Sequence, residues 1–333
     1  MEQFEKRICQ SLKSVAQKVD ALKKSDSLVF SVFTDLHTYD INHVYAQKLM
    51  RTLELISKEI GTDFAVDLGD NLGMLGRETH ISNSDLKVVL DDLLDGIYKS
   101  AGCPLITVNG NHDAIGTDFF KADFWNSIVK GKFGLSDACY DKDGSYYFVD
   151  FEDTRFVVLS VPYGSDLYAE HPTPLWAFGD SQIKWLENTA LDTDKYVILL
   201  CHVPFFDYYR GDMESMLEVW NGENTAMSYI ANLCGWIEDC DKASEIINRF
   251  AESGNLIACF GGHTHLDSFW MPFEENDGFK NPVGCCQVVT EGVCIPAKSH
   301  EDYGVSVDIA IFTPSEKKLS IFRIGDGKRE LSI

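Results

Sequence analysis

The sequence predicts an α/β fold in which mixed β-strands are flanked by helices. Apolar runs with high strand propensity alternate along the chain with segments of helical periodicity. Side chains of metal-ligating types follow three of these runs, at residues 28–33, 103–108 and 256–260. Polar groups at the carboxyl ends of strands are typical of ligand sites in open α/β sheets. Residues 313–316 separate two alternating segments as in an antiparallel hairpin, which makes the strand arrangement mixed.

The first predicted element is a helix within residues 1–24. This stretch is charged and polar, and Leu12, Val15, Val19 and Leu22 recur at near-helical spacing. It lacks the apolar core of a signal peptide. We therefore expect an amphipathic helix that packs on the domain.

The remaining elements are assigned from their periodicity. Apolar or alternating runs predict strands at residues 27–34, 63–68, 103–108, 145–150, 155–161, 195–201, 256–261, 285–290, 304–312 and 318–324. Helical periodicity predicts helices at residues 42–60 and 180–191, and a further helix capped by Ser84. That helix should bury one face, because its apolar positions follow the i, i+3, i+4, i+7 rhythm at Leu86, Val89, Leu90, Leu93, Leu94 and Ile97.

The composition favours one domain over residues 1–333. Hydrophobic residues make up 45% of the chain, which is enough for a large core, and no linker or repeat divides it. No apolar run approaches the roughly 18 residues of a membrane-spanning helix. The 10 cysteines form no C-x-x-C pair and no export signal is present, so we expect reduced thiols and a cytoplasmic protein. Cys201 should lie in the core, since it alternates with His202 on a strand.

The net charge bears on the substrate. Lys and Arg total 29 against 52 Asp and Glu, which gives a net charge of −23. Such a protein repels a long polyanion and gains little from counterion release. The charge disfavours long nucleic acid as a partner, although a local patch can oppose the global sum.

Five short segments join metal-ligating side chains to a glycine or a second polar residue. In chain order they are Asp35-Leu36-His37, Gly69-Asp70-Asn71, Gly110-Asn111-His112-Asp113, Cys201-His202 and Gly262-His263-Thr264-His265. Each segment alone is compatible with a turn or a structural histidine. Five of them in one chain, several after predicted strands, indicate a metal site.

This mixture of side chains suits the hydrolysis of a phosphate ester. Two metals about 3.5–4 Å apart can ionise a shared water and neutralise the phosphoryl oxygens. Two cations that close repel each other unless an anionic ligand lies between them, and Asp70 is the natural bridge. Imidazoles and an amide oxygen can fill the other positions without excess negative charge. Manganese, iron, zinc, nickel and cobalt all suit such ligands.

In these segments the sequence resembles the calcineurin-like metallophosphoesterase family, whose pattern runs D-x-H, G-D, G-N-H-D/E, H and G-H-x-H. The resemblance implies two mixed β-sheets packed as a sandwich, with helices on the outer faces, and a binuclear centre of divalent or trivalent ions. It implies one metal held by Asp35, His37, Asp70 and His265, and a second held by Asp70, Asn111, His202 and His263. A metal-bridging hydroxide would attack in line, with His112 as acid to the leaving oxygen and Asp113 orienting His112.

Departures from the family's branches narrow the substrate. Protein Ser/Thr phosphatases carry G-D-x-V-D-R-G and G-N-H-E, whereas this chain has Gly69-Asp70-Asn71-Leu72-Gly73 and Asp113. The pattern looks more like the bacterial branch with cyclic-nucleotide phosphodiesterases and other small-ester hydrolases. We expect a small phosphodiester, nucleotide-sized or smaller, as the substrate. A phosphomonoesterase or a non-catalytic metal-binding scaffold is the alternative, and the oligomeric state stays open.

The segment over residues 205–254 has no part in the motif pattern. Its aromatic residues are Phe205, Phe206, Tyr208, Tyr209, Trp220, Tyr229 and Trp236. They predict either a cap that contacts the organic group of the substrate or packing of the insert on the body. Arg77 and Arg210 are candidates for a phosphate clamp, or else surface charges.

Overall fold

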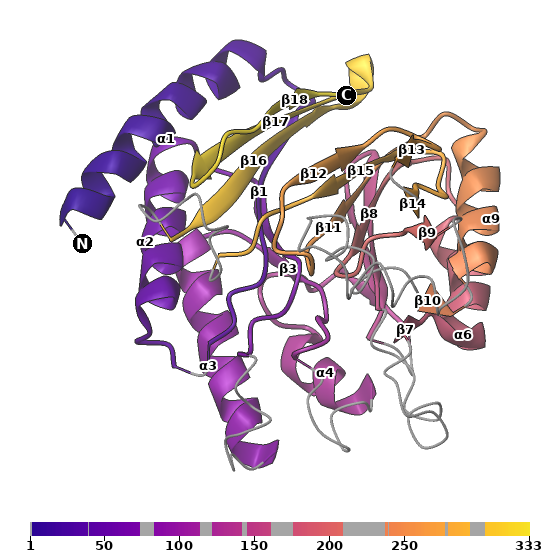
Figure 1. Cartoon of the computed structure of the whole chain (residues 1–333), viewed down its shortest axis with the longest axis horizontal. Helices are drawn as coiled ribbons and strands as arrows, with labels where there is room; N and C mark the ends of the chain where they lie inside the picture. The colour runs from indigo at the N-terminus through magenta and orange to yellow at the C-terminus, as the bar shows by residue number, and fades with distance from the viewer. Residues whose placement is uncertain are drawn as a thin grey trace.

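Two mixed β-sheets pack face to face in the computed structural model of the chain (Figure 1). The structure describes residues 2–38, 40–73, 83–113, 122–141, 145–160, 176–208, 237–238, 240–276, 279–293 and 304–333. Sheet A has the strand order β18-β17-β16-β1-β2-β3, and sheet B has the order β12-β15-β11-β8-β6-β5-β4. The predicted sandwich of two mixed sheets is confirmed.

Sheet A joins an early parallel unit to a late antiparallel one. The parallel strands are β1 (Leu28–Phe33), β2 (Phe64–Asp67) and β3 (Leu105–Thr107). The antiparallel strands are β16 (Ser306–Thr313), β17 (Lys318–Gly325) and β18 (Glu330–Ser332). A 3₁₀ turn over Pro314–Glu316 connects β16 to β17, so the predicted hairpin is confirmed. The short edge strand β18 has no counterpart among the predicted strands.

Sheet B also has a parallel centre and antiparallel edges. Its parallel strands are β6 (Thr154–Leu159), β8 (Tyr196–Cys201), β11 (Leu256–Gly261) and β15 (Cys286–Val289). The edge strands are β4 (Cys139–Tyr140), β5 (Tyr147–Phe151) and β12 (Ser268–Trp270). Two small sheets pair β7 (Trp176–Ala177) with β10 (Ile237–Glu238), and β14 (Phe279–Lys280) with β9 (Asp207–Tyr208) and β13 (Glu275–Asn276).

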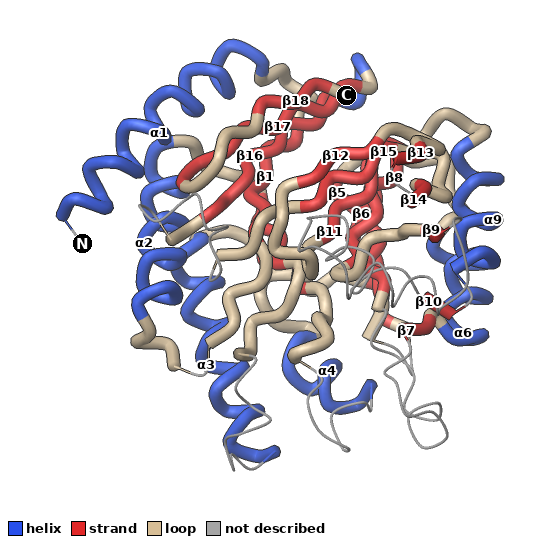
Figure 2. Tube along the Cα trace, in the orientation of Figure 1, coloured by secondary structure: helices blue, strands red, loops and turns tan. Residues whose placement is uncertain are grey.

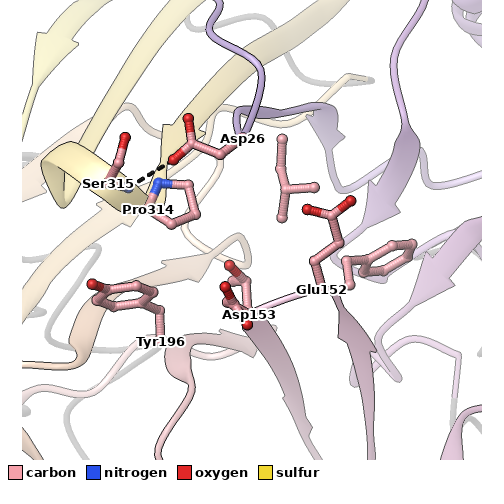
Figure 3. Close-up of a pocket in the computed structure, with 9 residues that line it drawn as sticks. Asp26, Glu152, Asp153, Tyr196, Pro314 and Ser315 are labelled. Atoms are coloured by element: carbon pink, nitrogen blue, oxygen red, sulfur yellow. Dashed lines mark hydrogen bonds between the residues drawn. The ribbon is translucent and has the colours of Figure 1, made fainter.

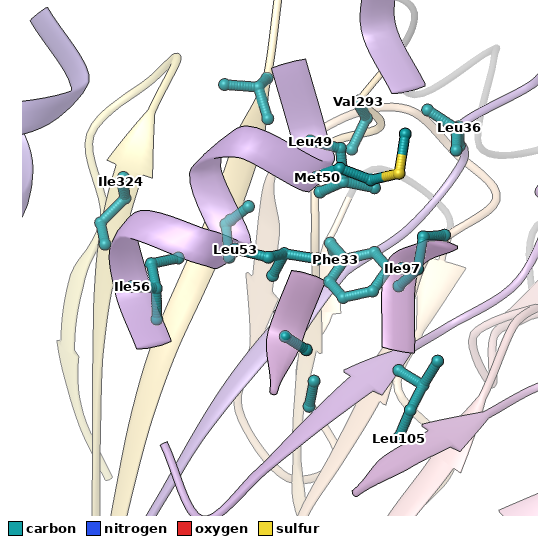
Figure 4. Close-up of a cluster of buried hydrophobic side chains, with 14 of the residues drawn as sticks. Phe33, Leu36, Leu49, Met50, Leu53, Ile56, Ile97, Leu105, Val293 and Ile324 are labelled. Atoms are coloured by element: carbon teal, nitrogen blue, oxygen red, sulfur yellow. The ribbon is translucent and has the colours of Figure 1, made fainter. Parts of the chain in front are cut away.

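Helices α1 (Glu2–Leu22), α2 (Val44–Glu59) and α3 (Asn83–Ala101) cover the outer face of sheet A, and α4 (Ala122–Val129) packs beside α3 (Figure 1). Figure 4 shows how Leu53 of α2 and Ile97 of α3 meet Phe33 of β1. Helix α1 buries an apolar stripe at Phe4, Ile8, Leu12, Val15 and Val19. Each helix therefore contributes one apolar face to this outer core.

Helices α6 (Gly179–Trp185) and α9 (Cys240–Ala251) lie on the other side of the sandwich, beside sheet B (Figure 2). The predicted helix at residues 180–191 ends differently from expectation, because one π-helical turn over Leu186–Ala190 follows α6. In that turn the N–H of Leu191 bonds to the carbonyl of Leu186 (3.0 Å). The wider turn keeps Leu186, Ala190 and Leu191 in the core.

A third apolar layer fills the space between the sheets. The ring of Phe30 from sheet A packs edge-on against Phe156 and Phe260 from sheet B, at centroid distances of 5.4 and 6.0 Å. The strand β1 is buried along its whole length, which explains its continuous apolar run. Cys201 lies in the core as predicted, and the described cysteines are free thiols. Among the described helices, none has the length and apolarity to cross a membrane.

Candidate metal centre

The five predicted motifs all lie where parallel strands end. Three follow β1, β2 and β3, which are neighbours in sheet A, and two follow β8 and β11, which are neighbours in sheet B. Because parallel strands point their carboxyl ends to one edge of a sheet, each sheet contributes half of a single site. The structure thus brings together the predicted motifs that carry Asp35, His37, Asp70, Asn111, His202, His263 and His265.

The histidines and aspartates of the site form two groups that share no residue, and a third group, His37, Asp70 and His112, overlaps both. The ligand atoms of Asp35, His37 and His265 lie within 4.8 Å of one another, as do those of Asp70, His202 and His263. A metal that binds nitrogen and oxygen at about 2.0–2.2 Å can span ligand atoms roughly twice that distance apart. Each group is therefore able to hold a metal ion after small adjustments.

Polar atoms without hydrogen bonds support this fit. Asp35 Oδ1, Asn111 Oδ1 and His202 Nε2 are buried, and none of them has a hydrogen-bond partner. Leaving a buried polar atom unpaired costs about 1–3 kcal/mol, so such atoms are rare unless a ligand satisfies them. These are oxygen and imidazole nitrogen donors, which first-row transition metals bind.

Asp35 divides its two carboxylate oxygens between the backbone and the site. Oδ2 accepts hydrogen bonds from the Thr34 hydroxyl (2.7 Å) and from the N–H of His263 (3.0 Å). Oδ1 lies 3.3 Å from His265 Nε2 and 3.4 Å from His37 Nε2. One oxygen thus fixes the loops while the other faces the imidazoles.

Asp70 is arranged in the same way. Its Oδ1 accepts the N–H of His112 (2.7 Å), and its Oδ2 lies 3.1 Å from His202 Nε2 and 3.8 Å from His37 Nε2. Asp70 therefore reaches one histidine of each group within 3.8 Å, whereas Asp35 Oδ1 lies 4.0 Å from His202 Nε2.

Backbone carbonyls orient two of the imidazoles. His37 Nδ1 lies 3.1 Å from the carbonyl of Leu72, and His202 Nδ1 lies 2.8 Å from the carbonyl of Leu68. A carbonyl can only accept, so Nδ1 carries the proton in both rings. Nε2 is therefore the nitrogen that faces the carboxylates, and it offers its lone pair to a metal that displaces any proton there, as in metal-ligating histidines of known proteins.

The ligand loops are held in conformations that L-residues rarely adopt. Left-handed φ angles of 46° to 66° occur at Asp35, His37, Asp70, His263 and His265. Such residues cost of order 1–3 kcal/mol each and cluster at functional sites. Close approach of the loops requires glycine: a Cβ on Gly110 would lie 2.1 Å from the Asp70 nitrogen, and one on Gly262 would lie 2.1 Å from the Thr34 hydroxyl.

The carboxylates stay ionised although they are buried. Burial alone would raise the pKa of Asp70, but the charge of the His202 imidazolium beside it holds that pKa well below its usual range. Burial likewise opposes the charged form of His202, yet Asp70 and Asp35 raise the pKa of that imidazole to about 9. The site therefore presents anionic oxygens, the form that binds metal ions.

Asp113 has different partners from those expected. Its carboxylate accepts the N–H groups of Asp70 (2.9 Å), Asn71 (2.9 Å), Leu72 (3.1 Å) and Gly110 (3.1 Å). Within the described residues, the ring of His112 is not among its hydrogen-bond partners. Asp113 thus joins the loops after β2 and β3, and its role as the residue that orients His112 stays a prediction.

Two further buried residues support these loops and have no place in the predicted site. The Thr34 hydroxyl holds Asp35, and Asp67 accepts hydrogen bonds from the Gly69 N–H (3.0 Å) and from Asn71 Nδ2 (2.6 Å). Their signal in the sequence is a polar residue at the end of an apolar strand, directly before a motif.

We expect Asp113→Ala to destabilise the protein by at least about 3 kcal/mol, since four buried N–H groups lose their acceptor and each orphan costs about 1–3 kcal/mol. Urea unfolding of the metal-free variant measures this loss. Asp113→Asn keeps one oxygen and should lose less. If stability were unchanged and only catalysis suffered, the result would contradict this structural role and favour the predicted role of Asp113 beside His112.

His112 lies at the open side of the centre. Its side chain is 23% exposed, whereas those of His37 and His202 are 2% and 0% exposed. Its Nε2 lies 4.0 Å from Asp70 Oδ2, and its ring meets that of His37 edge-on at 4.8 Å. His112 also falls within ligand range of His37 and Asp70, so geometry alone allows either an acid or a ligand.

The aromatic insert divides into two parts. Phe205 stacks on Phe178 (5.3 Å) and Phe206 meets Trp270 (4.9 Å), and both side chains lie in the core beside sheet B. Helix α9, within the predicted cap at 205–254, packs in the same core. For these residues the packing interpretation holds. The other expected contacts fall on residues outside the described part of the chain, namely Arg77, Tyr209, Arg210, Trp220, Tyr229 and Trp236.

A cavity of about 220 Å³ lies away from the metal-ligand loops (Figure 3). Its lining includes Leu28, Thr154 and Tyr196, which begin β1, β6 and β8. The ligand-bearing loops follow the opposite ends of β1 and β8. The cavity is therefore not part of the centre.

Comparison with known proteins agrees with this architecture. The dimetal phosphatase from Danio rerio is similar in structure, with a TM-score of 0.57 and 14% identity over 92% of this chain and 98% of that one. The structure of PhoD is similar with a TM-score of 0.50 and 12% identity, over 93% of this chain and 72% of that one. These likenesses show the fold. No curated protein sequence matches the chain.

The sequence itself matches a family model. Residues 28–267 match the model of the calcineurin-like phosphoesterases, a range that includes all five motifs and both ligand groups. The match extends over more than half of the chain. The chain therefore belongs to the calcineurin-like phosphoesterase family.

Proposed function

We propose that the protein hydrolyses a small phosphodiester, nucleotide-sized or smaller, at a binuclear metal centre. The observation that carries this proposal is the pair of ligand groups that meet at Asp70, one containing Asp35, His37 and His265 and the other His202 and His263. A phosphoesterase with two adjacent ligand groups is suited to phosphoryl chemistry that needs two cations close together.

In this proposal seven residues hold the two ions. Asp35, His37, Asp70 and His265 bind the first, and Asp70, Asn111, His202 and His263 bind the second. The unpaired Oδ1 of Asn111 supports its inclusion. Two such metals, when bound, ionise water and neutralise the phosphoryl oxygens. Manganese, iron, zinc, nickel and cobalt remain candidates for the oxygen and nitrogen ligands.

His112 is proposed to protonate the leaving oxygen. The partial exposure of its side chain beside buried ligands supports contact with substrate. The hydrogen bond from its backbone N–H to Asp70 Oδ1 holds the residue at the centre. A general acid must reach the leaving oxygen directly or through one water. His112 is the histidine of the site that is best placed for this among the described residues.

The charge of the protein favours a small substrate with little negative charge. With a net charge of −23, long-range repulsion weakens the approach of polyanions and of dianionic monoesters more than that of a monoanionic diester. This supports a diester over a monoester and over nucleic acid.

A panel of esters tests the function. After loading with Mn²⁺ we expect two metals per chain by elemental analysis, and kcat/KM at least about tenfold higher for bis(p-nitrophenyl) phosphate than for p-nitrophenyl phosphate. Cyclic nucleotides and dinucleotides then rank the organic groups. A preference for the monoester, or efficient hydrolysis of long DNA at high salt, would overturn the diester proposal. One metal or none would overturn the binuclear centre.

A further inference from the structure

Five charged side chains form a network behind the metal-ligand loops, in which Asp267 is 29% exposed and the other four residues are buried. Two are cationic and three are anionic, and they come from β16, β17 and the segments after β11, β15 and β17: Asp267, Glu291, Asp308, Arg323 and Arg329. The side chains of Asp308, Arg323 and Glu291 are at most 3% exposed. Burying charges is costly, so such a network is retained only where its members pair closely.

Both arginines donate hydrogen bonds to the same two carboxylates, those of Asp267 and Asp308. Arg323 donates through Nε to Asp308 Oδ1 (2.7 Å) and through Nη2 to Asp267 Oδ1 (2.6 Å). Arg329 donates through Nη1 to Asp308 Oδ2 (2.7 Å) and through Nη2 to Asp267 Oδ1 (2.8 Å). Arg329 also bonds to the carbonyl of Val289 (2.6 Å). Planar guanidinium forks fix their partners in direction as well as distance.

Asp267 connects this network to the metal-ligand loop. It follows His265 by two residues, so the arginines anchor the end of the loop that carries His263 and His265. Asp267 Oδ1 also accepts the N–H of Glu291 (3.0 Å). One carboxylate oxygen thus ties the loop after β11 to the loop after β15.

The loop after β15 lies directly against the first ligand group. A Cβ on Gly292 would lie 2.8 Å from Asp35 Cβ and 3.3 Å from His265 Nδ1, and the N–H of Val293 donates to the carbonyl of Thr34 (3.0 Å). A shift of this loop would therefore move Asp35 and His265 together. Both of these close neighbours of Gly292 belong to the first ligand group.

We propose that Arg323 and Arg329 are positioning residues of the metal centre, which hold Asp35 and His265 in place through Asp267 and residues 290–293. This inference rests on the proposed binuclear function. Both arginines lie beyond residues 28–267, the part that matches the family model. Residues that orient ligands from behind typically change metal affinity by 10–100-fold when they are removed.

The sign of the effect separates positioning from charge. Removing a guanidinium takes a positive charge from the neighbourhood of a cation site, so a purely electrostatic role predicts tighter metal binding. Positioning predicts weaker binding. Lysine keeps the positive charge but lacks the planar guanidinium group. Arg323→Lys should therefore weaken metal binding only if the geometry of the guanidinium hydrogen bonds matters.

Calorimetric titration of the metal-free protein with Mn²⁺ tests the proposal. The variants are Arg323→Lys, Arg329→Lys and Arg323→Met. We expect each of them to bind Mn²⁺ about 10–100-fold more weakly at one site, the one that Asp35→Asn removes. Their affinity for Mn²⁺ at the other site should stay within about threefold of that of the parent. The lysine variants keep a buried cation, so they provide the test if Arg323→Met does not fold.

Arg155→Met is the matched control. Arg155 is a buried arginine that donates two hydrogen bonds to Asp150 (2.8 and 3.1 Å) and one to the carbonyl of Ala190 (3.0 Å). It lies near the start of β6, at the end of the strand opposite to the ligand loops. The Arg155→Met substitution should lower the thermal stability of the protein without changing its affinity for Mn²⁺ at either site. Unchanged or tighter binding in the Arg323 and Arg329 variants would overturn the positioning role. A parent that binds fewer than two Mn²⁺ would instead overturn the proposed function.

Discussion

Replacing Asp70 by Asn is expected to release both metals and to lower kcat/KM by at least about 10³. Asp70 Oδ2 lies 3.1 Å from His202 Nε2 and 3.8 Å from His37 Nε2, so it serves both ligand groups. Without this shared anion the two cations would repel each other with little compensation. Loss of the metals removes several kcal/mol of transition-state charge stabilisation, which corresponds to a factor of about 10³ or more.

Asp35→Asn is the matched comparison for this result. Asp35 Oδ1 faces His37 and His265, so its loss should release one metal while the other stays bound at higher free-metal concentrations. In Asp70→Asn, the asparagine side chain keeps an oxygen that can accept the hydrogen bond from the backbone N–H of His112. The loop of that variant should therefore remain folded. Elemental analysis after dialysis against a weak chelator measures both variants. If Asp70→Asn retained one metal as tightly as the parent, the bridging role would be wrong.

Replacing His112 by Ala is expected to keep both metals and to lower kcat by roughly 10²–10⁴, the usual range for a lost general acid. The loss should be large for esters with alkyl leaving groups and small for nitrophenyl esters, whose leaving oxygen needs no proton. Kinetics on a pair of diesters that differ only in the leaving group, together with metal analysis, test both statements.

His37→Ala provides the control for metal loss, because the His37 side chain in the first ligand group is 2% exposed whereas the His112 side chain is 23% exposed. His37→Ala should lose one metal and slow all substrates. Should His112→Ala behave like His37→Ala, then His112 is a ligand, as its distance of 4.0 Å from Asp70 Oδ2 also allows.

Local patterns predicted most of the strands and helices. The strand predicted at residues 256–261 is β11 (Leu256–Gly261), and the helix predicted at 42–60 is α2 (Val44–Glu59). Burial on one face leaves a period in the sequence and burial on both faces leaves a continuous apolar run, so such elements are visible without knowledge of their neighbours. The short edge strands β4, β12 and β18 carry too few residues to show a period.

The packing of the insert shows where local patterns fail. The aromatic residues Phe205 and Phe206 are equally compatible with a substrate wall and with a core, because both environments select large apolar side chains. Only the contacts of Phe206 with Trp270 and Phe279, which are distant in sequence, assign it to the core.

The sequence by itself determined the fold class, the family resemblance and the residues with ligand chemistry, because strand period and motif residues are properties of short segments. The tertiary structure decided how those segments meet. It placed β1, β2 and β3 in one sheet and β8 and β11 in the other, turned Asp113 toward four backbone N–H groups, and joined Arg323 to Asp267 across 56 residues. Hydrogen bonds and ion pairs of this kind depend on the distance between atoms in space, which no local pattern contains.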